Sequence, residues 1–321
     1  MADWQPSASL AVLRLRARLL AKARAFFQAR GVWEVDTPAL SRAATPDPHI
    51  HSFHLAGQDG QPRYLHTSPE FPMKRLLAAG SGAIYQICKV FRDGEAGARH
   101  NPEFTLLEWY RPGFDEQDLM TEVDALLREL VSEHLPLGET RRLTHAEALR
   151  RHAGVDPRVA GTAELRDCAR RHGLTPPALL GDSDEERDAW LDLLMSMVVE
   201  PALPRDCPVF IHDYPASQAA LARVHEGVAA RFELYLNGME LANGFHELAD
   251  AAEQRRRFEA ENRRRQAAGL APVPLDEGLL AALEAGLPDC AGVALGLDRL
   301  LMLISGEKHI AGVLAFAAER A

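Results

Sequence analysis

The chain has 321 residues, 47% of them apolar, which is enough to bury a large core and excludes a disordered protein. Its formal net charge of −10 at pH 7 argues against a nucleic-acid backbone as the main partner, because nonspecific affinity for phosphates comes from lysine and arginine. The four cysteines lie far apart with no CxxC pair, and no apolar run approaches the roughly 20 residues of a membrane span. We therefore expect a cytoplasmic protein that does not enter a membrane.

The first forty residues predict a long helix followed by an extended segment. Ser9 is a typical N-cap, the apolar residues after it recur at helical spacing, and Gly31 supplies a stop. The segment VWEVDTPAL then alternates in character until Pro38, as an edge or interface strand does. A helix that leads into an edge strand often builds a dimer.

A turn followed by a helix is predicted in YLHTSPEFPMKRLLAAG. Ser68 lies near the start of this helix, where a serine is most often a cap. Glu70 has two interpretations. Its carboxylate either favours the helix dipole or forms a salt bridge with an amine of a ligand.

A β-hairpin is the simplest interpretation of ICKVFRDGEAGARHNPEFTLLEWY, in which two apolar segments flank a loop that contains Gly94 and Gly97. Such a hairpin holds Arg92, with its fixed charge and planar donor fork, beside a phosphate. It also leaves Phe104 to stack against a flat ring. On these residues alone, an ordinary hairpin with one surface arginine is the alternative.

Residues from about 115 to 205 are predicted to form a helical insertion. Apolar spacing in LMTEVDALLRELVSEHL and in ERDAWLDLLMSMVVEPAL indicates amphipathic helices, and a stretch that contains Pro and Gly separates them. We assign no chemistry to this insertion.

Acidic and amide side chains gather in RFELYLNGMELANGFHEL. A hairpin with its turn at NG brings Glu233 and Glu240 together, and Asn243 adds a neutral oxygen. Hard oxygen ligands of this kind suit a magnesium ion that carries phosphates, whereas a solvated hairpin with exposed acids is the alternative. Glu247 follows at a position from which its carboxylate can meet a substrate ammonium group.

A glycine-rich strand is followed by a helix in PDCAGVALGLDRLLMLISG. Gly292 and Gly296 allow close approach of the backbone, and Arg299 lies in the first helical turn, where a fixed charge suits a polyphosphate. This segment is neither a Walker loop nor a dinucleotide fingerprint, and alone it is a weak signal.

Together, VDTPAL, FRDGE through EWYR, and GVALGLDRLL resemble the three motifs of class II aminoacyl-tRNA synthetases, in order and spacing. The resemblance covers nearly the whole chain and is closest to the lysine branch, to which RHNPEFTLLEWY and ELANGFHEL are similar. It implies an α+β fold, with an antiparallel sheet flanked by helices, in a single catalytic domain over residues 1–321. It also implies a homodimer formed through the first motif.

Two departures from lysyl-tRNA synthetases resemble the elongation factor P lysine ligase family. The chain starts almost at the first motif, so the anticodon-binding barrel is missing, and tRNA is not expected as a partner. Ala294 also stands where lysyl enzymes have a glycine. One added methyl group in a tight pocket changes substrate choice by about 1–3 kcal/mol.

The resemblance implies an ATP-dependent ligase that activates (R)-β-lysine as an adenylate and transfers it to the ε-amine of a lysine of elongation factor P. One alternative is a truncated lysyl-tRNA synthetase relative that charges tRNA or another acceptor with lysine. A non-catalytic regulatory paralogue is a further alternative, but the retention of Arg92, Glu240 and Arg299 argues against it. The preference between α-lysine and β-lysine stays open.

The resemblance also assigns roles to residues. Arg92 contacts the α-phosphate, Arg299 the γ-phosphate and Phe104 the adenine, and the catalytic residues are Arg92, Arg299 and Glu240. Family members often have Asn-Glu after the motif arginine, where this chain has Asp93-Gly94, and Glu95 is a candidate replacement for the missing acid. The implied ATP site is Arg92, Asp93, Gly94, Asn101, Phe104, Glu240, Leu241, Gly296 and Arg299. The implied amino-acid site is Ser68, Pro69, Glu70, Tyr110, Glu247 and Ala294, and the implied Mg²⁺ ligands are Glu233, Glu240 and Asn243.

Overall fold

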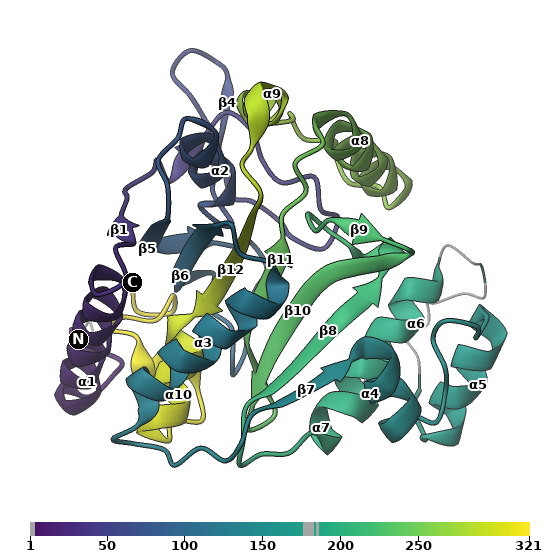
Figure 1. The fold of residues 1–321 in the computed structure, drawn as a ribbon. Coiled ribbons are helices and arrows are strands. Elements are labelled where there is room, and N and C mark those ends of the chain that lie inside the picture. The colour runs from purple at the N-terminus through teal and green to yellow at the C-terminus, as the bar shows by residue number, and fades with distance from the viewer. Residues whose placement is uncertain (1–3, 176–182, 184–185) are drawn as a thin grey trace.

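A nine-stranded sheet forms the centre of the protein in the computed structural model, which describes residues 4–175, 183 and 186–321 (Figure 1). Pairing within this sheet is antiparallel except at the β1–β5 and β7–β8 contacts. The strand order is β1 (Trp33–Glu34), β5 (Ile84–Phe91), β6 (Glu103–Pro112), β12 (Cys290–Gly296), β11 (Met239–His246), β10 (Val228–Leu236), β8 (Val209–Pro215) and β7 (Arg141–Thr144), with β9 (Val224–His225) paired to β10. A small sheet contains β2 (Leu40–Ser41), β4 (Pro62–Leu65) and β3 (His54–Ala56).

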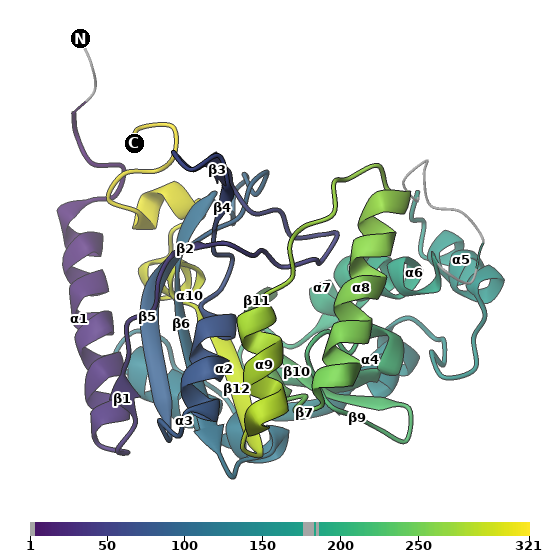
Figure 2. The ribbon, with the colours of Figure 1, turned by 90° about the horizontal axis from the view of Figure 1, so that it is seen from above.

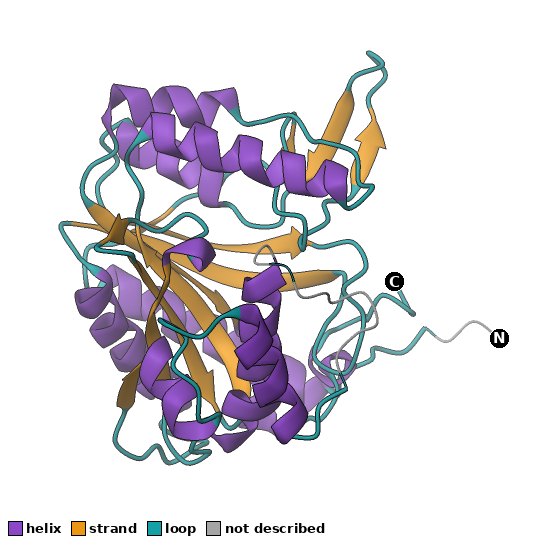
Figure 3. Ribbon diagram, turned by 90° about the vertical axis from the view of Figure 1, so that its right-hand side faces the viewer, coloured by secondary structure: helices purple, strands orange, loops and turns teal. Residues whose placement is uncertain are grey.

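Helices cover both faces of the central sheet (Figure 3). One face packs against α1 (Leu10–Gln28), α3 (Glu116–Val131) and α10 (Leu297–Ser305), which share one hydrophobic core with the strands. The other face carries α2 (Glu70–Ala78), α9 (Glu277–Gly286) and α8 (Ala251–Ala267), which lie side by side in Figure 2. The predicted α+β class, an antiparallel sheet flanked by helices, is therefore confirmed.

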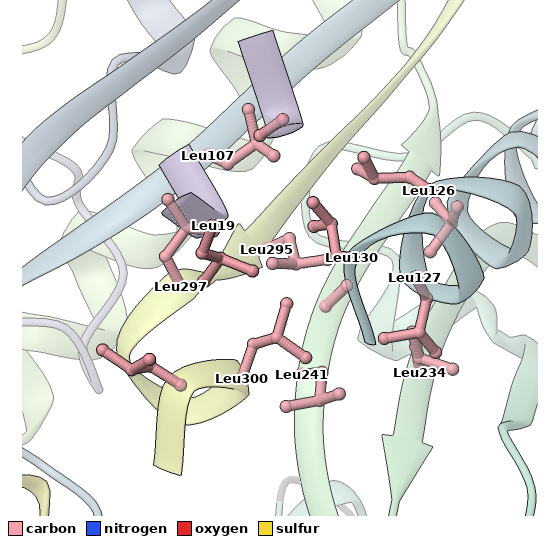
Figure 4. Packing of buried hydrophobic residues seen from close by; sticks show 14 of the residues in the cluster. Leu19, Leu107, Leu126, Leu127, Leu130, Leu234, Leu241, Leu295, Leu297 and Leu300 are labelled. Atoms are coloured by element: carbon pink, nitrogen blue, oxygen red, sulfur yellow. The ribbon is translucent and has the colours of Figure 1, made fainter. Parts of the chain in front are cut away.

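Strand periodicity decides which side chains reach the face under α2, α8 and α9. Leu107 of β6 and Leu295 of β12 point into the core beneath α3 and α10, where Figure 4 shows them among leucines from several elements. Because alternate residues of a strand point to opposite faces, Glu108 and Ala294 point the other way. The polar and small residues of β6 and β12 thus share the α2 side of the sheet.

A separate hydrophobic core lies beside β8 and β10. Its helices pack against these strands on the face of the sheet that also carries α2, α8 and α9. Residues 176–182 and 184–185 of this part of the chain lie outside the described residues. Helix α3, by contrast, belongs to the main core, and β7 extends the central sheet. The helical elements here are α4 (His145–His152), α5 (Thr162–Arg171), α6 (Arg187–Leu194), the π-helix η2 (Met195–Val199) and α7 (Glu200–Ala202). The division of the chain into domains stays a prediction.

Local signals in the first eighty residues gave mixed predictions. The side chain of Ser9 caps α1, as predicted, and Ser68 accepts a hydrogen bond from the main chain of Glu70 at the start of α2. The predicted strand VWEVDTPAL is mostly wrong, because only Trp33 and Glu34 pair with the sheet before the chain turns away toward β2. Among the described residues, no helix combines the length and the apolar character that crossing a membrane requires. The described residues also include the short 3-10 helices η3 (Ala216–Gln218) and η4 (Ile310–Val313).

Candidate active site

A cavity of about 990 Å³ opens on the α2 side of the sheet. Strands β6, β11 and β12 supply its floor, and helices α2, α8 and α9 contribute to its walls. The connection between β2 and β3 also lines the cavity. Its main chain is held to α8, because the side chain of Arg265 donates to the carbonyl of Asp47 at 3.1 Å. Two chemically different halves meet in this one space.

Arginine side chains mark the first half. The guanidinium carbon of Arg92 lies 5.0 Å from the centre of the Phe104 ring, and its Nη1 lies 3.4 Å from the carboxylate of Glu95. Arg92 directly follows β5 and Phe104 lies in β6, and these two strands pair in register from Ile84–Tyr110 to Phe91–Glu103. A cationic fork next to an aromatic face is suited to a phosphate joined to a flat base.

Arg299 approaches the same half from the first turn of α10. Its Nη1 donates to the carbonyl of Glu240 at 3.0 Å and to the carboxylate of Glu240 at 3.3 Å. Its Nη2 lies 2.8 Å from Nε2 of His100, and because burial and the Arg299 charge lower the pKa of His100, the neutral ring accepts this bond. Helix α10 therefore brings a second fixed positive charge to the cavity that Arg92 lines.

Three carboxyl groups define the second half. Glu108 accepts hydrogen bonds from the hydroxyls of Ser68 and Tyr110, both at 2.7 Å. Burial and the nearby charge of Glu70 raise the pKa of Glu108 to about 8. Burial likewise raises the pKa of Glu247 to about 7, against the opposing charge of a neighbouring lysine. Cationic groups of a ligand can therefore take the place of the protons that these buried carboxyl groups otherwise hold.

The backbone of β12 forms the closest part of the floor. A Cβ atom built on Gly292 would lie 2.2 Å from the Tyr110 ring and 2.5 Å from Oε1 of Glu247. Such distances are far inside van der Waals contact, so this position has room only for glycine. Gly296, in contrast, would place a Cβ at an ordinary 3.8 Å from its nearest neighbours.

A second cavity of about 530 Å³ adjoins the first and shares Arg231 and Glu240 with it. Glu233 lines this smaller cavity and accepts from Arg231 at 2.5 Å, from the hydroxyl of Tyr214 at 2.7 Å and from that of Tyr235 at 2.5 Å. Burial opposes ionisation of Glu233, but the Arg231 charge and these hydroxyls outweigh it and lower its pKa.

The oxygen atoms beside the two cavities fit a magnesium ion in their chemistry. Burial and the charge of Glu233 raise the pKa of Glu240 against the opposing charge of Arg299, so a cation beside the two carboxylates would favour their ionised form. Asn243 pairs with Glu233 across β10 and β11, and its side-chain oxygen accepts from Arg231 at 3.2 Å. Among the described residues, no three His, Cys, Asp or Glu side chains are grouped to hold a metal, so an amide oxygen would have to complete the ligand set.

Comparison with known proteins identifies the architecture. The family model of "tRNA synthetases class II (D, K and N)" matches residues 1–320. A protein of Edwardsiella ictaluri called "Elongation factor P--(R)-beta-lysine ligase" is 51% identical over 329 residues, which is 100% of this chain and 99% of the relative. Proteins of the same name from Salmonella paratyphi B and Salmonella schwarzengrund are 48% identical, over 100% of this chain and 99% of each relative. The chain belongs to the class II tRNA synthetases and to their branch of elongation factor P (R)-β-lysine ligases.

Most residues that the class II resemblance assigned to substrates lie in one place. The larger cavity is lined by Ser68, Glu70, Arg92, Glu95, Asn101, Phe104, Tyr110, Glu240, Leu241, Asn243, Glu247, Ala294, Gly296 and Arg299. Four assigned residues do not line it, namely Pro69, Asp93, Gly94 and Glu233. Their roles, like those of the lining residues, stay predictions.

The loop between β5 and β6 explains why Asp93 and Gly94 do not line the cavity. Gly94 has a φ of +81°, so it serves the turn after Arg92. The main chain of Asp93 donates to the carbonyl of His51 at 2.8 Å and so attaches the loop to the connection above the cavity. The side chain of Asn101 donates to Glu103 at 2.6 Å and accepts from a main-chain amide near the carboxyl end.

Two residues of this site were missed in the sequence, namely Glu108, which is 2% exposed, and Lys74, which is 1% exposed. Gly292, in contrast, was expected to allow close approach of the backbone, and it is the glycine that no larger residue can replace. Glu108 gave a usable signal, because it is a lone charge inside the apolar run FTLLEWY. Lys74 gave none, because a lysine in an amphipathic helix is ordinarily solvated.

Proposed function

We propose that this protein is an ATP-dependent ligase that activates (R)-β-lysine as an acyl adenylate and transfers it to the ε-amine of a lysine of elongation factor P. The relatives that match its full length carry this activity in their name. One observation supports the proposal most directly: a single cavity joins an arginine half, suited to ATP, to a half with three carboxyl groups, suited to a diamino acid. A class II domain with this pairing adenylates a substrate that carries two ammonium groups.

In the first step, a carboxylate oxygen of the amino acid attacks the α-phosphorus of ATP, and the bond to the leaving pyrophosphate breaks. Arg92 stabilises charge on the α-phosphate, Arg299 binds the γ-phosphate, and the Phe104 ring stacks on adenine. Positioning and charge neutralisation supply most of the acceleration of such a reaction.

The amino acid is held by its ammonium groups. Glu70, Glu108 and Glu247 accept from them, while Ser68 and Tyr110 orient the carboxylate of Glu108. The Ala294 methyl group narrows the floor of the cavity on the β12 side and is our candidate for the preference between lysine isomers. A methyl contact of this kind changes selection by about 1–3 kcal/mol.

Magnesium is the proposed partner of ATP in this site. Glu240, together with Glu233 and Asn243, would hold it. The ion, when bound, neutralises phosphate charge. Arg231 would hold the Glu233 carboxylate and the Asn243 amide oxygen in place, since it donates to both.

In the second step, the neutral ε-amine of the acceptor lysine attacks the carbonyl carbon of the adenylate. The carbon–oxygen bond to AMP breaks, and the attacking nitrogen loses a proton. No nucleic acid is needed for this transfer. The enzyme acts as a homodimer through α1 and β1, which expose apolar surface at Leu10 (62%) and Trp33 (52%).

Intact mass spectrometry of purified elongation factor P tests the function. The factor is incubated with ATP, this protein and either (R)-β-lysine or α-lysine, and a parallel reaction contains lysine tRNA. We expect the factor to gain the mass of one lysyl group and no tRNA to be charged. The modified fraction of the factor should be larger with (R)-β-lysine than with α-lysine. Unmodified factor together with charged tRNA would overturn the proposal.

A further inference from the structure

Lys74 is the only lysine that the structure buries among the described residues, and it lies behind the carboxylate half of the cavity. Its Nζ lies 2.6 Å from Oε1 of Glu70 and 2.6 Å from Oε2 of Glu247. Glu70 is one turn away on the same helix, but Glu247 follows β11, so Lys74 joins two distant parts of the chain. Burial disfavours its charge, yet the two carboxylates outweigh burial and raise the pKa of Lys74, so that it stays an ammonium group.

The charges of this half do not balance within the protein. Of its three carboxyl groups, those of Glu70 and Glu247 share one ammonium group, that of Lys74. Glu108 has only hydroxyl donors, from Ser68 and Tyr110. When all three carboxyl groups are ionised, the half therefore carries two uncompensated negative charges. A ligand with two ammonium groups supplies the missing charge, whereas a monoamino acid supplies half of it.

We propose that Lys74 is a positioning residue for amino-acid recognition: it holds the carboxylates of Glu70 and Glu247 at a set separation and cancels one of three negative charges, so that the cavity selects a diamino acid. This inference rests on the proposed function, and it assigns a role to a residue that contacts no substrate. Lys74 does not line the cavity, so it acts only through the two carboxylates that do.

The arrangement makes amino-acid affinity depend on pH near neutrality. Glu247 must be ionised to receive an ammonium group, and its pKa of about 7 is lowered by Lys74 and raised by Glu70. Neighbouring Tyr110 and Cys290 have raised pKa values and stay neutral in this range. The other charged groups that face Glu247 are Glu108 of β6 and His246, which is bound to Glu116 and Asp289.

The test is ATP–pyrophosphate exchange with the intact enzyme, measured at pH 6 to 8.5 with lysine or β-lysine as the varied substrate. For the wild type we expect the KM of the amino acid to fall as pH rises through about 7, where Glu247 ionises, and to fall further toward about 8, where Glu108 ionises. Lys74→Met removes the charge that lowers the pKa of Glu247. The pH at which KM falls because Glu247 ionises should therefore rise by about one unit or more. The same variant should raise the KM of the amino acid about tenfold or more at pH 7, with the KM of ATP within about twofold.

Lys89→Met is the matched control, because it removes an ammonium group from an exposed ion pair with Glu103 on the neighbouring hairpin. It should leave both KM values and the pH profile as in the wild type. A purely structural role for Lys74 would lower the amount of active enzyme without moving the pH at which KM changes. An unmoved profile in Lys74→Met, with an unchanged KM for the amino acid, therefore overturns the proposal.

Lys74→Arg covers the case in which Lys74→Met does not fold. Arginine keeps the charge but replaces a point donor with a wider fork. The KM of the amino acid should rise about tenfold, while the pH profile stays within about 0.3 units of the wild type. A KM within twofold of the wild type overturns the proposal. Failure of the wild type itself to exchange pyrophosphate with either lysine isomer would instead overturn the proposed function.

Discussion

Arg299 donates from one guanidinium nitrogen to both the main-chain carbonyl and the carboxylate of Glu240, at 3.0 Å and 3.3 Å. The bond to the carbonyl does not depend on the charge of Glu240, so it fixes the direction of the guanidinium group from α10. The bond to the carboxylate is the one that a phosphate can replace. In the proposed function, the arginine is therefore held in place before ATP binds, which lowers the entropic cost of ordering its side chain on binding.

Arg299→Ala should reduce the rate of ATP–pyrophosphate exchange by on the order of 100-fold, because a preset donor to developing charge is lost. The KM of ATP should rise, and the KM of the amino acid should change little. Arg256→Ala is the matched control, since Arg256 is an exposed arginine bound to Glu253 on α8. Exchange by Arg299→Ala at the wild-type rate would show that this arginine does not bind the triphosphate.

Gly292→Ala should abolish activation of the amino acid. The added Cβ would lie 2.2 Å from the Tyr110 ring and 2.5 Å from Oε1 of Glu247, so both side chains would have to move out of the carboxylate half of the cavity. ATP binding, measured by calorimetry, should stay near the wild-type affinity. Gly161→Ala is the control, because nothing lies within 4 Å of its added methyl group. Normal exchange by Gly292→Ala would contradict the close floor of the cavity.

Local patterns predicted the elements of this fold well where partners are near in sequence. The β5–β6 and β10–β11 hairpins are both present, because alternating strands around a glycine-containing loop need no distant information. The segment after Gly31 was predicted less well. Strand β1 is only Trp33–Glu34 and pairs in parallel with β5, a partner that lies fifty residues away and that no local pattern reveals.

The site was predicted as a set of residues but not as a set of charges. Glu70 and Glu247 were expected to meet an amine, and both line the cavity. What the residue pattern did not contain is that Lys74 already bridges them and that Glu108 has only hydroxyl partners. Both facts depend on burial and on contacts between three separate elements. Neither can be predicted from the local sequence around a charged residue in an amphipathic segment.

Asp298→Ala should lower the free energy of unfolding by about 3–5 kcal/mol, the usual cost of breaking a buried charge pair. Asp298 is 1% exposed, pairs with Arg16 of α1 and accepts from the main-chain amide of Thr105 at 2.7 Å. It therefore joins α1, β6 and α10. Urea denaturation of the ligand-free protein measures the effect.

The control for Asp298 is Glu133→Ala, which removes an exposed carboxylate from its pair with Lys22. It should change the free energy of unfolding by less than about 1 kcal/mol, as exposed pairs do. Equal effects of the two variants would mean that Asp298 does not hold the three elements together.

Glu108→Gln should stabilise the ligand-free protein at high pH while abolishing activation of lysine. Burial and the Glu70 charge raise the pKa of Glu108 to about 8 in the fold, so the native state binds a proton more tightly than the unfolded chain does. Wild-type stability is then lost as pH rises from the unfolded value near 4.5 to about 8. The loss is on the order of 1.4 kcal/mol per unit of pKa difference.

Glutamine resembles the protonated acid, so the variant avoids this loss. In urea denaturation at pH 5 and pH 8.5, wild type and Glu108→Gln should therefore differ little at the lower pH and by a few kcal/mol at the higher pH. Glu129→Gln, on the exposed side of α3, should change the free energy of unfolding by less than about 0.5 kcal/mol at either pH. If the difference in free energy of unfolding between Glu108→Gln and wild type were instead the same at both pH values, burial would not keep the carboxyl group protonated. The charge balance of the carboxylate half would then have to be revised.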